Sequence, residues 1–209
     1  MKDFIKLGFA LLAVTFIAGF VLHTAYEKTK PMIEEIQRSQ EAAARKEVLP
    51  EAAEFNPVKM QEDKKDSLLI DNTVENRYWV GLDKEGEETG FVIKIYAYGY
   101  DPMPIIAMAG LKKDGTLIGL KIIAQKETPG LGARIQETVE EAGAPVVWFT
   151  RQFQGLKAGA IEVIKGDVPE GVNGISAITA ATITSKAVTD AVNKGYLAIA
   201  RESLKGEGE

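Results

Sequence analysis

An uncharged apolar run near the N-terminus is the strongest hydrophobic pattern in the chain. Residues 7–22 read LGFALLAVTFIAGFVL, and Lys6 and His23 stand at its two ends. A run of this composition predicts a short membrane-spanning helix, because its side chains match the hydrocarbon core of a bilayer. The two flanking side chains can reach toward the lipid headgroups. We therefore expect a single-pass anchor over residues 1–26.

A cleaved signal peptide is the alternative interpretation, because such peptides also combine a basic start with an apolar stretch. A small-x-small cleavage site should then follow. Phe16 before Ala18 and His23 before Ala25 spoil the two candidate sites, which favours a retained anchor. Its orientation stays open, because lysine and arginine counts decide topology and a pair of lysines flanks the run on each side.

A charged, alanine-rich stretch follows the apolar run. Between Glu27 and about Glu47, apolar residues recur at helical spacing after Pro31, and proline suits the first turn of a helix. We expect a helical stalk and linker over residues 27–66. A solvated linker is the alternative, and residues 61–66, QEDKKD, are typical of an exposed loop.

From about Ser67 the pattern changes to short runs rich in β-branched and aromatic residues, which are typical of strands. These runs cover residues 77–82, 90–98, 105–111 and 116–124. A turn at Lys113-Asp114-Gly115 predicts that the last two form a hairpin. We place one folded domain over residues 67–209.

The rest of the domain mixes helices and short strands. Helical spacing predicts an amphipathic helix over 133–142 and a final helix over 185–201. Short strands are expected at 146–149 and 160–164, and 166–174 is rich in turn residues. Strands followed by helix, strands and helix indicate an α+β fold.

Composition excludes several classes of function. The formal charge of −5 and pI of about 5.2 leave no basic surface for nucleic acid. Without cysteine the chain has no disulfide, thiolate nucleophile or iron–sulfur ligand. His23 is the only histidine, so we expect no histidine triad or zinc site and no other metal site. Any redox chemistry must come from an organic cofactor.

Residues 127–132, ETPGLG, form the first candidate binding segment. Proline fixes one backbone angle, and the glycines allow left-handed conformations and close approach of a ligand. The helix predicted to follow would add amide donors. An ordinary strand-to-helix turn is the alternative; the spacing fits neither a Rossmann loop nor a P-loop. The candidate residues are Glu127, Thr128, Gly130, Leu131 and Gly132.

Residues 176–185, SAITAATITS, form the second candidate segment, just before the final helix. Small side chains let a planar cofactor approach the backbone, and hydroxyls with helix amides can bind phosphate. A threonine oxygen there could also become an ester. The alternative is a strand followed by a helix N-cap. The candidate residues are Ser176, Thr179, Ala180, Ala181, Thr182, Thr184 and Ser185.

Together these features resemble a family: the FMN-binding domain found in the G subunit of the Rnf electron transport complex and in the C subunit of the sodium-pumping NADH:quinone reductase. The order of anchor, stalk, β-rich region, ETPGLG loop and threonine motif covers nearly the whole chain. The resemblance implies that Thr179-Ala180-Ala181-Thr182 is an attachment motif. A flavin transferase would join FMN to Thr182 through a phosphoester. The ETPGLG loop would be a wall of the flavin pocket.

Two positions depart from the family pattern. Ala180 stands where the family usually has glycine, and Ser176 stands where it usually has an aspartate, six residues before the modified threonine. A serine hydroxyl can still hydrogen-bond to phosphate. The short chain and the run at 182–188, TITSKAV, favour the resemblance to the Rnf protein over its quinone-reductase relative.

The resemblance implies an electron relay within a membrane complex that moves electrons between ferredoxin and NAD and translocates sodium ions or protons. Other subunits of that complex would be its partners, and no residue of this chain would act as acid or base. The flavin domain would lie on the outer face of the cytoplasmic membrane. The alternatives are the C subunit of the quinone reductase, a stand-alone tethered flavin carrier, and a binding or structural protein without flavin.

Overall fold

The computed structural model describes residues 2–60 and 74–206 of the chain. It consists of two compact units, residues 1–42 and 43–209. The first unit is helical throughout, and the second contains the sheets and the remaining helices. The exposed loop predicted at 61–66 lies outside the described residues.

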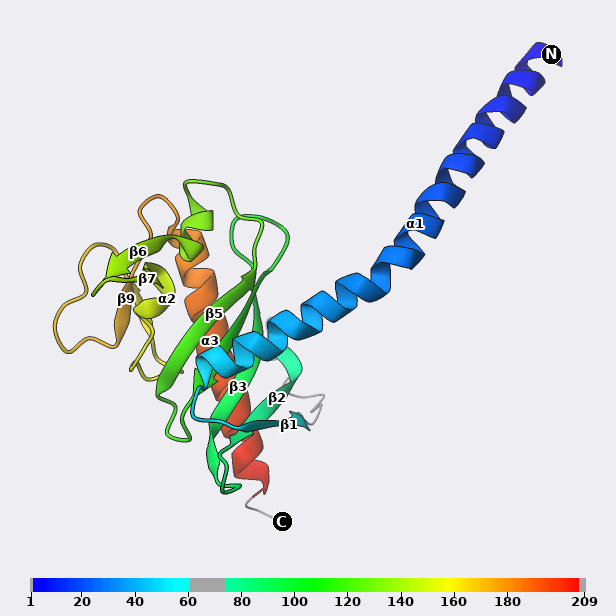
Figure 1. Cartoon of the computed structure of the whole chain (residues 1–209). Helices are drawn as coiled ribbons and strands as arrows, with labels where there is room; N and C mark the ends of the chain where they lie inside the picture. Colours follow the sequence, from blue (N-terminus) through cyan, green and yellow to red (C-terminus); the bar gives the residue numbers. More distant parts are fainter. Residues whose placement is uncertain (1, 61–73, 207–209) are drawn as a thin grey trace. The chain divides into compact units, whose positions relative to one another are not determined.

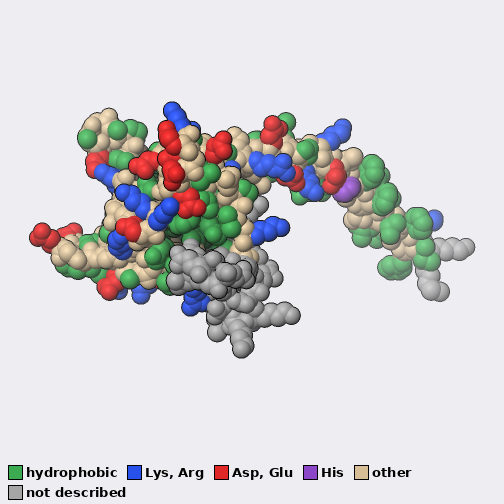
Figure 2. All heavy atoms as spheres, turned by 90° about the horizontal axis from the view of Figure 1, so that it is seen from below, with side chains coloured by type: hydrophobic (Ala, Val, Ile, Leu, Met, Phe, Trp, Pro, Cys, Tyr) green, Lys and Arg blue, Asp and Glu red, His purple; other side chains and the backbone are tan. Residues whose placement is uncertain are grey.

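Helix α1 (Lys2–Val48) contains the predicted membrane segment. Its most apolar window has a mean hydropathy of 2.3 and no buried residue, and Figure 2 shows hydrophobic side chains clustered toward its N-terminal end. Thr15, the one polar residue of the run, donates its hydroxyl to the carbonyl oxygens of Leu11 and Leu12, at 3.0 Å each. Its polar group is therefore satisfied within the helix. By length and composition α1 can cross a membrane.

The predicted stalk is helical, but Pro31 does not begin a new helix. It lies inside α1, which continues on both sides of it. An internal proline removes one backbone hydrogen bond and crowds the preceding turn. Here the local cost does not interrupt the helix.

A five-stranded antiparallel sheet forms the centre of the second unit, with the strands in chain order. Its strands are β1 (Glu54–Lys59), β2 (Val74–Leu82), β3 (Glu88–Ala97), β4 (Ile105–Leu111) and β5 (Leu117–Ala124). The four predicted strands are confirmed as β2 to β5, and the hairpin between β4 and β5 is present. The sequence interpretation missed β1, so the sheet begins earlier in the chain than the predicted start near Ser67.

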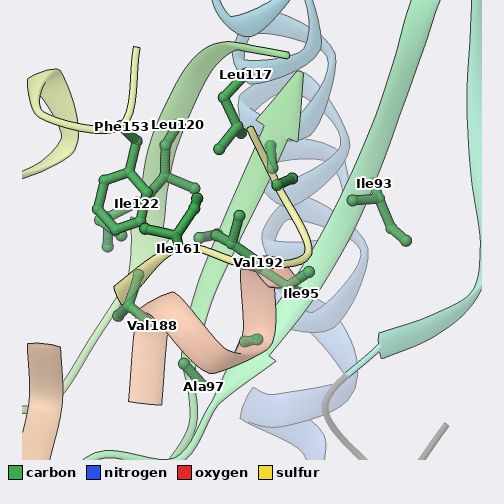
Figure 3. Close-up of a cluster of buried hydrophobic side chains, with 14 of the residues drawn as sticks. Ile93, Ile95, Ala97, Leu117, Leu120, Ile122, Phe153, Ile161, Val188 and Val192 are labelled. Atoms are coloured by element: carbon green, nitrogen blue, oxygen red, sulfur yellow. The ribbon is translucent and has the colours of Figure 1, made fainter. Parts of the chain in front are cut away.

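Helix α3 (Thr182–Gly206) covers one face of this sheet (Figure 1). Val188 and Val192 on the helix pack in one buried cluster with Ile93 and Ile95 of β3 (Figure 3). Alternate residues of a strand point to opposite faces, so Ile93 and Ile95 share a face. Isoleucine and valine fill this layer, and each such fully buried side chain contributes about 1.5–3 kcal/mol.

The opposite face of the sheet packs against the end of α1. Val48 and Leu49 form a second buried cluster with Trp79 of β2 and Met108 of β4. Gly110 of β4 allows this approach, because a Cβ atom there would lie 2.1 Å from the carbonyl oxygen of Val48. The sheet is therefore covered on both faces.

The helix predicted over residues 133–142 is wrong. The structure has a short 3-10 helix, η1 (Gly132–Gln136), followed by a hairpin of β6 (Thr138–Glu141) and β7 (Ala144–Val147). Ala142 and Gly143 have φ values of 52° and 80°, which suit a tight hairpin turn. The helical spacing of three apolar residues concealed this Ala-Gly turn.

Hydrogen bonds at Glu137 fix the start of the hairpin. Its Oε2 accepts from Arg134 Nε at 2.7 Å and from Trp148 Nε1 at 3.2 Å. These two donors, Arg134 first, hold the pKa of the Glu137 carboxyl below its ordinary value. The ionised Glu137 carboxylate therefore links Arg134 of η1 to Trp148, the residue that follows β7.

The remaining elements connect the hairpin to α3. They are α2 (Trp148–Arg151) and the parallel pair β8 (Glu162–Ile164) and β9 (Gly174–Ser176). The strand predicted at 146–149 ends at Val147, where α2 follows, and the one at 160–164 corresponds to β8. Strand β9 was missed, and α3 begins before the predicted Ser185. The α+β prediction is confirmed.

Candidate functional site

A cavity of about 330 Å³ lies where three loops of the second unit meet. One wall follows β3, one lies between β5 and η1, and one is the start of α3. The lining residues are Tyr100, Glu127, Thr128, Leu131, Gly132, Ala180, Ala181, Thr182, Ile183 and Thr184. The two candidate segments of the sequence therefore form opposite parts of one site.

Glu127 joins the three walls of this cavity. Its side chain is 4% exposed. Its Oε1 accepts hydrogen bonds from the backbone amides of Tyr100 (3.0 Å) and Asp101 (3.1 Å), and its Oε2 accepts one from Thr184 Oγ1 (2.7 Å). Both oxygens act as acceptors, which is the pattern of an ionised carboxylate.

Two glycines make room for the Glu127 carboxylate. A Cβ atom on Gly99 would lie 2.4 Å from its Oε1, and one on Gly132 would lie 2.2 Å from its Oε2. The Gly132 Cβ would also lie 2.7 Å from Thr184 Oγ1. Any side chain at either position would displace the carboxylate from its donors.

Residues 128–131 form a tight turn beside the carboxylate. The Leu131 amide donates to the Thr128 carbonyl at 3.1 Å, and Gly130 has a φ of 77°. Pro129 and Gly130 occupy the two central positions, where a type II turn favours these residues. Of the two glycines predicted to allow left-handed conformations, Gly130 adopts one and Gly132 does not. The predicted helix start is not confirmed, because η1 is a short 3-10 helix that provides no extended set of free amides.

The start of α3 forms the third wall. Ala180 has a φ of 65°, and the Ser185 amide donates to the Ala181 carbonyl at 3.1 Å, as in a first helical turn. α3 is a long helix that begins at Thr182, so its first amides lack intrahelical acceptors. These amides and the helix dipole favour an anion at this end of the cavity.

The central part of the chain matches the model of a known family. Residues 99–196, which include every lining residue of the cavity, match the FMN-binding domain family.

Two curated relatives extend this match over most of the chain. The G subunit of the Na(+)-translocating ferredoxin:NAD(+) oxidoreductase complex of Acetobacterium woodii is 36% identical, over 92% of this chain and 89% of the relative. This chain belongs to the family of these G subunits. The G subunit of an ion-translocating oxidoreductase complex of Methanosarcina acetivorans is 31% identical, over 92% of each chain.

Solved structures share the fold of this G-subunit family member. NqrC of Shewanella oneidensis superposes with a TM-score of 0.55 and 19% identity, over 74% of this chain and 85% of that chain. The C subunit of the Na(+)-translocating NADH-quinone reductase of Parabacteroides distasonis gives 0.50 and 22%, over 72% and 77%. At these identities the likeness concerns the fold alone.

Eight of the predicted site residues of this G-subunit family member line the cavity, and four do not. Gly130 shapes the turn but does not line the cavity; it lines a separate pocket with Pro129 and Arg134. Ser176 lies in β9 and donates to the Gly166 carbonyl at 2.7 Å. Thr179 is exposed outside the cavity, and Ser185 is buried beneath it, with its hydroxyl donating to the Ala181 carbonyl.

Sequence interpretation missed three residues of the site. Tyr100 and Ile183 line the cavity and are 77% and 58% exposed, and Gly99 accommodates Glu127. The only signal for the first was an aromatic residue in a loop that contains Gly99 and Pro102. The position of Tyr100 beside the other two walls of the cavity depends on contacts between residues that are far apart in the chain.

Proposed function

We propose that this chain is the flavoprotein subunit of an ion-translocating ferredoxin:NAD oxidoreductase complex of the Rnf type. It relays electrons through FMN that is covalently bound to Thr182 by a phosphoester. The observation that carries the proposal is the cavity in which the ETPGLG loop meets the threonine motif at the start of α3. Membership of the G-subunit family supports the assignment to such a complex.

Among the hydroxyl residues of the threonine motif and the helix start that follows it, Thr182 is best placed for attachment. It lines the cavity and is partly exposed. Thr184 is 1% exposed and donates to Glu127, and Ser185 is fully buried and hydrogen-bonded. Thr179 is exposed but lies outside the cavity. A transferase can therefore reach the Thr182 hydroxyl without opening the core.

The cavity fits the parts of FMN. The first amides of α3 would hold the phosphate, and Tyr100, Leu131 and Ile183 provide apolar surface for the ring system. The volume lies within the usual range of small-ligand sites. FMN supplies chemistry that can proceed in one-electron or two-electron steps. This chain's residues bind and orient it, and none is required as an acid or base.

In the part of the chain that the structure describes, one helix is long and apolar enough to cross a membrane, and it supports a location at the membrane. We place the flavin domain on the outer face of the cytoplasmic membrane, where a flavin transferase modifies it. The anchor raises the effective concentration of the flavin near its redox partners. One helix provides no ion pathway, so the other subunits of the complex carry ion translocation.

Fluorescence of flavin on a denaturing gel tests the attachment. The native protein, made in cells that contain the transferase, should give a fluorescent band, because a phosphoester survives unfolding. Thr182→Ala should abolish it. Thr138→Ala, a matched control at an exposed threonine of β6 outside the cavity and the motif, should leave it unchanged.

Two results would contradict the proposal. Fluorescence that persists in Thr182→Ala would place the flavin on another residue. Absence of fluorescence in the native protein as well, with the transferase active on a known substrate, would favour a protein that carries no covalent flavin.

A further inference from the structure

Glu127 is a buried carboxylate in the wall of the flavin cavity, and holding a phosphate does not account for it. A carboxylate repels phosphate and does not hold one; the first amides of α3 would hold the phosphate, and Glu127 itself accepts a hydrogen bond from Thr184 in that first turn. We propose that the negative charge of Glu127 lowers the reduction potential of the flavin. This inference rests on the proposed function, because it requires flavin in the cavity.

The carboxylate is held in one position by groups from two other segments. Backbone amides of Tyr100 and Asp101 fix Oε1, and Thr184 Oγ1 fixes Oε2. The Glu127 amide in turn donates to Gln125 Oε1 at 2.6 Å. These hydrogen bonds fix the orientation of the Glu127 carboxylate, so it keeps its position when the charge of its surroundings changes.

The charge is also poorly screened. The Glu127 side chain is 4% exposed, and no lysine, arginine or histidine lines the cavity. Within the described residues no ion pair is recorded for Glu127. A buried charge without an opposite partner acts on its neighbours through a lower dielectric than water provides.

The cavity is small enough for this charge to affect its occupant. Glu127 is one of the residues that line this space of about 330 Å³, so a ring bound there lies close to the carboxylate. Two unit charges about 8 Å apart, at an effective dielectric of about 20, interact strongly enough to change an equilibrium constant more than tenfold. Adding an electron to the flavin makes it more negative, so the nearby carboxylate opposes reduction.

Glu127→Gln separates this electrostatic effect from the structural role of the side chain. Glutamine has the same shape. Its oxygen can accept from both backbone amides, and its amide group can donate to the Thr184 hydroxyl, which also accepts. All three connections can therefore be kept while the charge is removed.

The test is a potentiometric titration of the full-length flavoprotein in detergent, with sodium dithionite as reductant, redox mediators, and flavin absorbance as the signal. Glu127→Gln should raise the midpoint by at least the tenfold equivalent, 59 mV for a one-electron step. Glu140→Gln, which removes an exposed charge on the β6–β7 hairpin, should cause no comparable shift. Thr184→Val removes one hydrogen bond but keeps the charge, and should not reproduce the rise.

An unchanged midpoint in flavin-loaded Glu127→Gln would overturn the inference and leave the proposed function intact. An equal rise in Thr184→Val would overturn it as well, because the effect would then follow from the hydrogen bond. A native protein without flavin would instead overturn the proposed function itself.

A second variant decides the question if Glu127→Gln fails to fold or to hold flavin. Thr128 lines the same cavity next to Glu127 and is exposed. Thr128→Asp adds a carboxylate to this wall and should lower the midpoint, whereas Thr128→Asn, its uncharged match, should not. Equal midpoints for these two variants would overturn the inference.

Discussion

Ala180 has a backbone conformation that favours glycine. Its φ of 65° lies in the left-handed region, which costs a residue with a Cβ atom roughly 1–2 kcal/mol. The resemblance noted from the sequence places glycine at this position of the attachment motif. The conformation gives a physical reason: the chain must turn sharply here to present Thr182 at the start of α3.

Replacing Ala180 by glycine should therefore stabilise the protein. Relief of the left-handed strain exceeds the extra backbone entropy that glycine loses on folding, so we expect a gain of about 0.5–1 kcal/mol in the free energy of unfolding. Urea denaturation followed by circular dichroism measures it. The matched control is Ala187→Gly inside α3, which should destabilise by about 1 kcal/mol. A loss of stability in Ala180→Gly would contradict the argument.

At the scale of elements, the sheet provides a glycine contact surface for the end of α1. Gly110 and Gly119 are register partners in β4 and β5. A Cβ atom on Gly110 would lie 2.1 Å from the carbonyl oxygen of Val48, and one on Gly119 would lie 3.2 Å from the Cα atom of Val48. Backbone therefore packs directly on backbone at this point.

Gly110→Ala should destabilise the second unit by about 1–3 kcal/mol, because overpacking forces the end of α1 away from the sheet. The midpoint of chemical denaturation, read from tryptophan fluorescence, reports it, since Trp79 lies in the same buried cluster. Gly119→Ala is the matched control, and its looser contact should cost clearly less. Equal effects of the two substitutions would show that the close contact with Val48 is not the cause.

At the scale of the whole molecule, the chain divides into a helical unit that contains the apolar segment and a unit with its own two-sided core. Both buried clusters lie within residues 43–209. The cavity belongs to the same unit. We therefore expect this unit to fold without residues 1–42.

A shortened chain that begins at Ala43 should fold and leave the membrane. We expect it in the aqueous phase of a Triton X-114 separation, with the full chain in the detergent phase, because the exposed apolar side chains of α1 are removed. Its circular dichroism should show a cooperative thermal transition. An aqueous full-length protein would argue against the anchor, and a shortened chain without a transition would show that the second unit needs residues 1–42.

The sequence by itself determined the features that depend on local pattern. Runs rich in β-branched and aromatic residues predicted β2 to β5, an uncharged run predicted the anchor helix, and the absence of cysteine directed the redox chemistry to an organic cofactor. Prediction from local pattern failed where the signals for two kinds of element were about equally strong. The Ala142-Gly143 turn interrupts a run with helical spacing, and β1 is a short, mostly exposed strand that contains Pro57.

Only the tertiary structure decided how the site is assembled. Glu127 and Thr184 are far apart in the chain, and their 2.7 Å hydrogen bond joins the ETPGLG loop to the start of α3. Sequence composition indicated that both segments could bind a ligand, but not that they share one cavity. It also left Thr179, Thr182 and Thr184 equivalent. Folding separates them: Thr184 is buried, and Thr179 lies outside the cavity that Thr182 lines. Both differences depend on neighbours that folding brings from other parts of the chain.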